Sequence, residues 1–158
     1  MRKSFAFLIS SMAAAVLMTG CAKPSGTPVP ENVDMQSAKK LKMPIVIYSV
    51  GVQKDERGMS RPVVYYVNTS PRPINLATFL LEGKTSEGES IMLWADGYEK
   101  VSPDKSCQRG MLGGRWNRAD IECVEIKQAG LQINGSYYRF TEENINQLFQ
   151  DPSINTCE

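Results

Sequence analysis

The chain has 158 residues, enough for one domain with a hydrophobic core of its own. It contains no histidine, which removes the commonest general base, the commonest zinc ligand and the nucleophile pairs built on histidine. Acidic and basic residues nearly balance, with a formal net charge of +1, and no basic stripe is visible. We therefore expect no nucleic acid partner.

The first 20 residues have the pattern of a targeting segment. Arg2 and Lys3 precede an apolar run, residues 5–18, that suits a signal peptide and is short for a bilayer span. The sequence then passes through Thr19-Gly20 to Cys21, an ending that resembles the lipobox of bacterial lipoproteins. The resemblance implies a signal peptide over 1–20 and diacylglycerol on the thiol of Cys21. It further implies a lipid anchor in the cell envelope, in the outer membrane facing the periplasm.

Residues 21–42 are predicted to form a flexible tether, because prolines and a glycine alternate there with few apolar side chains. From residue 43 to 158 we expect a single domain. Its first part consists of short β-branched and aromatic runs, which predict strands at 45–50, 62–67, 74–82, 90–94 and 121–126. Both alternating sets of side chains in 74–82 are largely apolar, so this strand is expected to be central.

The strongest hairpin signal is Asn134-Gly135, between strands expected at 131–133 and 137–140. Both central residues of such a turn need positive φ, which Asn and Gly tolerate. The alternation slips near Ala129-Gly130, which predicts a bulge. Residues 95–115 are expected to be irregular. A short C-terminal helix is predicted after Thr141, with Ile145, Leu148 and Phe149 on its apolar face.

Six or seven short strands in this length indicate an all-β, two-sheet β-sandwich with a short C-terminal helix, and a barrel is the alternative. The segment from Val64 to Ile74, with Trp116, Cys123 and Asn134-Gly135-Ser136, resembles immunoglobulin-like domains of bacterial secreted proteins and lipoproteins. The resemblance covers residues 44–140. It implies an immunoglobulin-like sandwich and says nothing about function, because sandwiches serve many functions.

Three cysteines remain if Cys21 carries lipid: Cys107, Cys123 and Cys157. An exported chain enters an oxidising compartment, so we expect a disulfide. A Cys107–Cys157 bond is favoured over Cys107–Cys123, because Cys107 and Cys157 lie in the segments that most need a crosslink. Cys123 is then a buried free thiol in a strand. An intermolecular disulfide or a redox role is the functional alternative.

Aromatic and arginine side chains gather around the irregular stretch, and these residue types are the usual anchors of protein interfaces. They predict a partner-binding patch made of Trp94, Tyr98, Arg109, Arg115 and Trp116. Packing of the aromatic residues in the core is the other interpretation.

The carboxylates match no calcium-binding loop, so we expect neither a metal nor another cofactor. The sequence therefore predicts a non-catalytic, membrane-anchored lipoprotein that serves as a protein-binding or structural accessory module for an envelope protein. An inhibitor of a periplasmic enzyme such as lysozyme is the alternative.

Overall fold

The computed structural model describes residues 24–110 and 112–157. The predicted signal peptide and the predicted lipidation site at Cys21 lie outside the described residues. The elements are, in chain order, α1 (Met35–Lys40), β1 (Ile45–Lys54), β2 (Ser60–Asn68), β3 (Ile74–Thr85), β4 (Ser90–Gly97), β5 (Ile121–Ile133), β6 (Ser136–Phe140) and the 3-10 turns η1 (Ile145–Leu148) and η2 (Pro152–Asn155).

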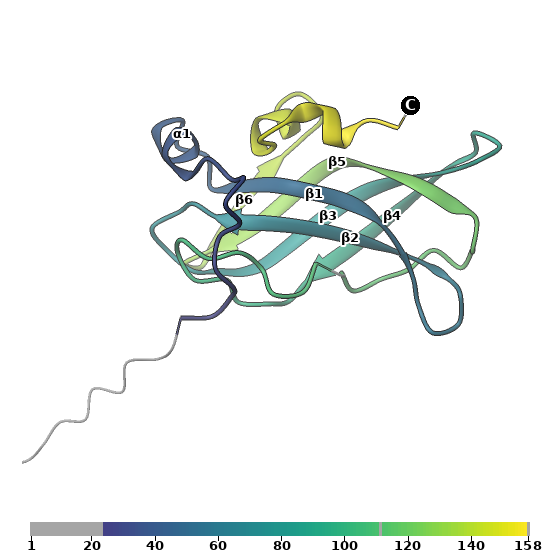
Figure 1. Ribbon diagram of the computed structural model, residues 1–158, viewed down its shortest axis with the longest axis horizontal. Coiled ribbons are helices and arrows are strands. Elements are labelled where there is room, and N and C mark those ends of the chain that lie inside the picture. The colour runs from purple at the N-terminus through teal and green to yellow at the C-terminus, as the bar shows by residue number, and fades with distance from the viewer. Residues whose placement is uncertain (1–23, 111, 158) are drawn as a thin grey trace, which may run out of the picture.

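The strands form two antiparallel sheets that pack face to face (Figure 1). One sheet contains β1 and β2, and the other has the order β4-β3-β5-β6. The main core lies between them, and Tyr66 of β2 meets Phe79 of β3 there with ring centroids 6.2 Å apart. The predicted two-sheet, mostly β architecture is confirmed at this level.

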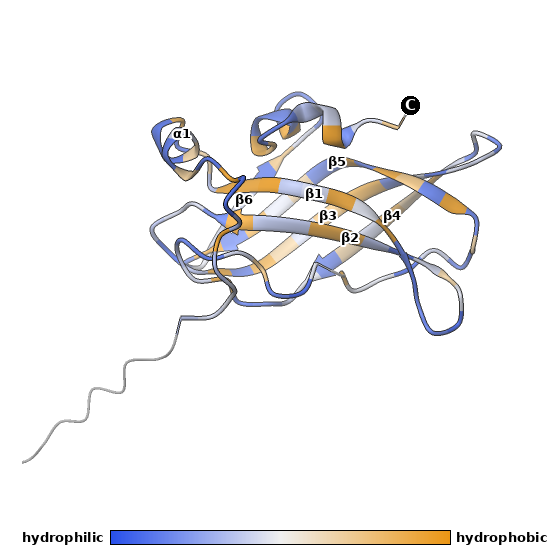
Figure 2. Cartoon of the chain, viewed as in Figure 1, coloured by the Kyte–Doolittle hydropathy of each residue, from blue (hydrophilic) through white to orange (hydrophobic). Residues whose placement is uncertain are grey.

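Strand β3 is central, as its sequence predicts, with β4 on one edge and β5 on the other. Its alternation buries Ala77, Phe79 and Leu81 in the core and turns Thr78 and Leu80 outward. A side chain as large as Phe79, with no exposed surface, contributes about 2 kcal/mol by its burial. Apolar residues follow the strands while the turns are hydrophilic (Figure 2).

The predicted Asn134-Gly135 hairpin is confirmed, with φ values of 49° and 80° at the two turn residues. The bulge in β5 falls two residues before the predicted place. Leu80 of β3 pairs with Gln128 and Leu81 with Ile126, which leaves the residue between them as the extra one. The single strand β5 therefore runs through both segments that the sequence predicts separately.

The stretch expected to be irregular is partly ordered by backbone pairing. The Cys107 N–H group donates to β2 (3.0 Å), and the Gly110 carbonyl accepts from β2 (2.8 Å). Gly113 then exchanges two backbone hydrogen bonds with Asp96 of β4. Residues 105–110 thus pair with the free edge of β2 and residues 112–113 with β2 and the free edge of β4, which protects both edges.

The C-terminal segment connects the other two edges. In place of the predicted helix the chain forms the 3-10 turn η1, because a stretch this short gains little from α-helical hydrogen bonding, and a second 3-10 turn, η2, follows it. Its expected apolar residues Ile145, Leu148 and Phe149 are buried. The Asn155 side chain then bonds the N–H and C=O groups of Ile126 at the edge of β5.

The expectation of a free tether does not describe residues 24–42. Thr27 exchanges two backbone hydrogen bonds with Ser106 (2.9 and 3.0 Å). Val33 and, in α1, Ala38 pack on the outer side of the β1–β2 sheet in a second apolar cluster with Val46. The arm lies against the domain because this side of the sheet is itself apolar and would otherwise face water.

Candidate interaction face

The outer side of the four-stranded sheet carries large apolar side chains that no other element of the described residues covers. Trp94 of β4 stands opposite Leu80 of β3, and Met92 stands one row further along. Trp94 is 55% exposed and Met92 is 49% exposed. The strand period of two places these residues outside, because Ala95 and Phe79 on the alternate positions are in the core.

Tyrosines extend this surface at its other end. The Tyr137 ring of β6 lies over Gly130, and its hydroxyl group is 3.1 Å from that of Thr78. A Cβ atom on Gly130 would stand 1.8 Å from the Tyr137 oxygen, so this position requires glycine. Tyr98 follows β4 and donates its hydroxyl proton to Asp96 (2.9 Å), a hydrogen bond that raises the pKa of Tyr98.

We call this surface the aromatic face and define it by Leu80, Met92, Trp94, Tyr98 and Tyr137. The sequence analysis predicts Trp94 and Tyr98 as anchors, but it does not predict Leu80, Met92 and Tyr137. Their signal is the alternation within β3, β4 and β6, but only the pairing register shows that these positions share one side of a sheet.

Two of the other predicted anchors, Trp116 and Arg115, lie elsewhere. Trp116 is buried, donates its indole N–H to the Ile91 carbonyl (3.1 Å) and packs over Gly83, so it belongs to the core. Arg115 forms an ion pair with Asp55 (3.2 Å) at the β1–β2 turn. The predicted patch of five is therefore wrong as a single surface.

Arg109 lies near Tyr98. Both line a hollow of about 420 Å³ beside the end of β4. The backbone N–H groups of Gln108 and Arg109 donate to the Glu99 carboxylate (2.6 and 2.9 Å), which fixes this segment next to the aromatic face.

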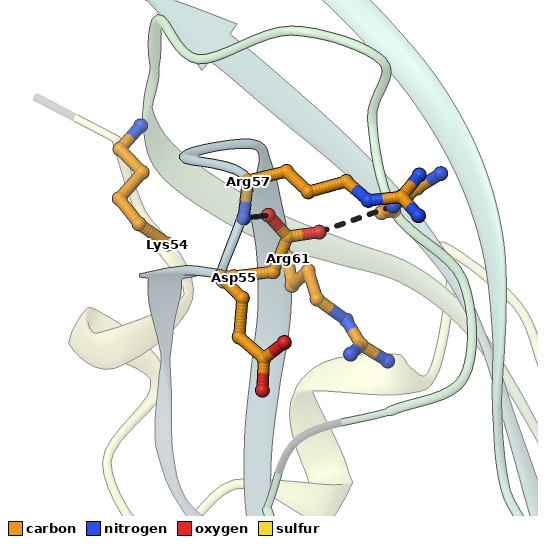
Figure 3. Close-up of a pocket in the computed structure, with 6 residues that line it drawn as sticks. Lys54, Asp55, Arg57 and Arg61 are labelled. Carbon is orange, nitrogen blue, oxygen red and sulfur yellow. Dashed lines mark hydrogen bonds and ion pairs between the residues drawn. The ribbon is translucent and has the colours of Figure 1, made fainter.

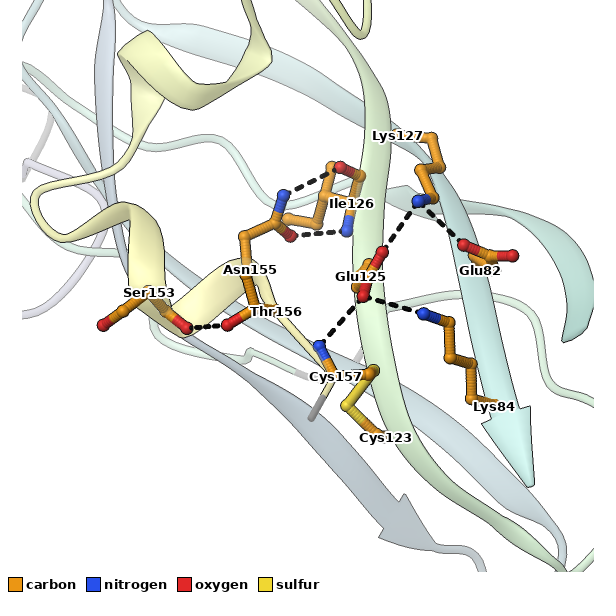
Figure 4. Close-up of polar contacts among 10 residues, drawn as sticks. All are labelled: Glu82, Lys84, Cys123, Glu125, Ile126, Lys127, Ser153, Asn155, Thr156 and Cys157. Carbon is orange, nitrogen blue, oxygen red and sulfur yellow. Dashed lines mark hydrogen bonds and ion pairs between the residues drawn. A yellow bond between two sulfur atoms is a disulfide. The ribbon is translucent and has the colours of Figure 1, made fainter. Parts of the chain in front are cut away.

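Ion pairs border the aromatic face beside β5 (Figure 4). Lys127 bonds Glu82 (2.8 Å) and Glu125 (2.7 Å), and Lys84 bonds Glu125 (2.9 Å). Burial is the largest single influence on Glu125 and acts to raise its pKa. Hydrogen bonds from Lys127, the Cys157 N–H group and Lys84 together outweigh it and lower the pKa to about 2. Two carboxylates thus balance two ammonium groups, and the border carries no net charge.

The disulfide joins Cys123 to Cys157, so the predicted Cys107–Cys157 bond is wrong. Cys107 is instead a buried free thiol. Its sulfur accepts from the Tyr66 N–H group (3.4 Å), and burial raises the pKa of the Cys107 thiol to about 11. Backbone pairing with β2 turns Cys107 into the core, whereas Cys123 lies outside the core on β5, where the chain end returns to it.

Over residues 24–110 and 112–157, no group of three or more Cys, Asp or Glu side chains is placed to hold a metal ion. Within the same residues, every helix is too short to cross a bilayer. Comparison of the chain with protein-family models, curated proteins and solved structures gives no match.

Proposed function

We propose that this chain is a lipid-anchored envelope lipoprotein whose domain binds a protein partner through the aromatic face and performs no catalysis. The observation that carries the proposal is a cluster of exposed aromatic and apolar side chains on one side of a sheet, around Trp94. Large clustered apolar surfaces on otherwise soluble domains are typical of interaction sites. An immunoglobulin-like relationship is part of the proposal, and the two packed antiparallel sheets support it.

The chemistry of the surface suggests the chemistry of the partner. Trp94 and Met92 offer an apolar centre, and the tyrosine hydroxyl groups offer hydrogen bonding around it. Because the Glu82–Lys127–Glu125–Lys84 border neutralises itself, it provides no long-range attraction for a strongly charged partner. We therefore propose a partner protein with an apolar patch and a neutral polar rim, the usual composition of a protein interface.

The anchor is proposed from the lipobox-like ending at Cys21. The described chain begins at Pro24, only three residues or about 11 Å of extended chain further on. Hydrogen bonds of Ser25 to Ser102 and of Thr27 to Ser106 then hold the arm against the domain. In this proposal the domain stays close to the outer membrane on its periplasmic side and presents the aromatic face to a partner there.

The inhibitor alternative is less well supported. An inhibitor that enters an enzyme cleft needs a projecting loop, and residues 95–115, which the sequence predicts to be irregular, are the candidate for it. Residues 105–110 and 112–113 instead pair with β2 and β4, so these parts of the stretch are committed to the fold.

In-cell photo-crosslinking of the full chain tests the proposal. A photoreactive residue replaces Met92 or Tyr98 on the aromatic face and, as a control, Gln53, an exposed residue of β1. We expect one dominant crosslinked protein from positions 92 and 98 and none from position 53.

Trp94→Ala should abolish that crosslink, while Leu41→Ala should leave it intact. Leu41 is a matched control because it is also apolar and is 70% exposed, but lies beside α1 away from the aromatic face. Neither change should alter the unfolding midpoint measurably, since surface substitutions cost little stability. Equal crosslinking at position 53, or a crosslink that survives Trp94→Ala, would refute the proposed interface.

A further inference from the structure

A second hollow, of about 520 Å³, lies at the opposite end of β4 from Tyr98, where the β1–β2 turn meets the segment before β5. None of its lining residues belongs to the aromatic face. Six charged side chains from the end of β1, the turn, β2 and the 112–118 segment line it (Figure 3): Lys54, Asp55, Glu56, Arg57, Arg61 and Arg115.

Most of the hydrogen-bonding capacity of Asp55 is already used. Its carboxylate accepts from the N–H groups of Met59 and Arg57 (2.9 Å each) and from the Arg115 guanidinium. The Met59 hydrogen bond is the largest cause of a pKa of Asp55 below its ordinary value. Asp55 therefore acts as a fixed structural anion that orders the turn and positions Arg115.

The guanidinium groups, in contrast, have N–H donors that form no hydrogen bond among the described residues. Arg61 gives one Nη2 hydrogen to the Leu112 carbonyl (3.0 Å), yet its Nε atom is buried without a partner. It is the one buried side-chain nitrogen or oxygen without a partner over residues 24–110 and 112–157. The other hydrogens of its terminal nitrogens form no hydrogen bond among the described residues, so Arg61 can donate them to an anion in the hollow.

The positive and negative side chains that line the hollow also do not balance. The lining holds four cations and two anions, and one of those anions, Asp55, is paired with Arg115. Lys54 turns its ammonium group to the Ser60 hydroxyl group, away from the arginines (Figure 3). Arg57 has no hydrogen bond or ion pair from its guanidinium among the described residues, and Glu56 is the only carboxylate of the lining that forms no ion pair.

We propose that this hollow binds a phosphate group, with Arg57, Arg61 and Arg115 as its donors. Guanidinium groups present paired N–H donors that match phosphate oxygens. Because Lys54 turns away, three guanidinium groups stand against two carboxylates, and a phosphate offers them three acceptor oxygens where a carboxylate offers two. Both inorganic phosphate and an organic phosphomonoester supply this chemistry.

Titration of the full chain in detergent, followed by calorimetry, tests the site. The probes are inorganic phosphate and glycerol 3-phosphate, with acetate as a monoanion for comparison. We expect saturable binding of a phosphate probe and at least tenfold weaker binding of acetate. Stronger binding of glycerol 3-phosphate assigns the site to a phosphomonoester, and stronger binding of inorganic phosphate assigns it to the free ion; both support the proposal.

Variants locate the binding. Arg61→Gln should weaken phosphate about tenfold or more, the effect of losing a charge-assisted hydrogen bond. Arg57→Gln should also weaken it and serves as the second variant, because Arg57 is exposed and its loss leaves the fold intact. Glu56→Gln should strengthen binding by removing the opposing carboxylate.

Arg72→Gln is the matched control, since Arg72 is an exposed arginine of the β2–β3 turn outside the hollow. Absence of saturable binding, acetate binding equal to phosphate, or equal losses in Arg72→Gln and Arg57→Gln would overturn the proposal. Because the readout is binding of small anions, its failure leaves the proposed function of the aromatic face untouched.

Discussion

Replacement of Cys157 by serine should remove a large share of the stability of this domain. The bond to Cys123 closes a loop with a sequence separation of 34. The chain-entropy relation for a loop of that length gives about 4 kcal/mol at 25 °C, through restriction of the unfolded chain. The same bond fixes the end of a segment that packs Leu148 and Phe149 into the core and closes the edge of β5 through Asn155.

Urea denaturation followed by tryptophan fluorescence measures the effect, because the buried Trp116 becomes exposed on unfolding. We expect Cys157→Ser to lower the free energy of unfolding by about 2–4 kcal/mol. A reducing agent should lower the stability of the unaltered protein to a similar extent and should leave Cys157→Ser unchanged.

Cys107→Ala is the control, since Cys107 is buried but free. This variant should lose about 1–2 kcal/mol of stability through a small cavity and should stay sensitive to the reducing agent. If Cys107→Ala abolishes that sensitivity, or if Cys157→Ser remains sensitive, Cys107 forms the disulfide and the reasoning fails.

Three further predictions concern the sheet. Glu125→Gln should cost about 2 kcal/mol of unfolding free energy at pH 7, because the pKa of Glu125 is lowered from 4.5 to about 2 and its exposure is partial. That stabilisation is fully present above pH 4.5 and is lost as the pH falls toward 2, so urea midpoints of variant and parent should converge there. Glu122→Gln, an exposed neighbour without an ion pair, should show neither effect. Gly83→Ala should cost about 1–3 kcal/mol in the same assay, since its Cβ would lie 2.8 Å from the Trp116 ring, and a neutral result would contradict that packing. Asn155→Ala should cost about 1–2 kcal/mol by leaving backbone groups of β5 unpaired, and hydrogen exchange at the Ile126 amide should accelerate.

Local sequence patterns predict those parts of this fold that depend on neighbours in the chain. The turn at Asn134-Gly135 follows from the positive φ that these two residues tolerate. Strand β3 follows from an alternation whose two sets are both largely apolar, and that pattern also predicts its central place. The lipid anchor at Cys21 and the envelope location stay predictions.

Contacts between distant segments decide the rest, because pairing register and loop closure depend on the whole fold. Composition does not distinguish Trp94 from Trp116. The register of β4 nevertheless exposes Trp94, and Gly83 of β3 makes room for the buried Trp116. The glycines of residues 95–115 suggest an irregular loop, but the free edges of β2 and β4 supply partners for much of its backbone.

The sequence by itself determined that this is a mostly β chain, where its main strands and its tightest hairpin lie, and that histidine chemistry is excluded. Only the tertiary structure decided which cysteines pair, because burial of Cys107 beside β2 leaves Cys123 for the returning C-terminus. It also decided that Arg57 and Arg61 meet Arg115, more than 50 residues further along the chain, around one hollow. Such clusters form when strands far apart in sequence pack together, and no local pattern encodes that packing.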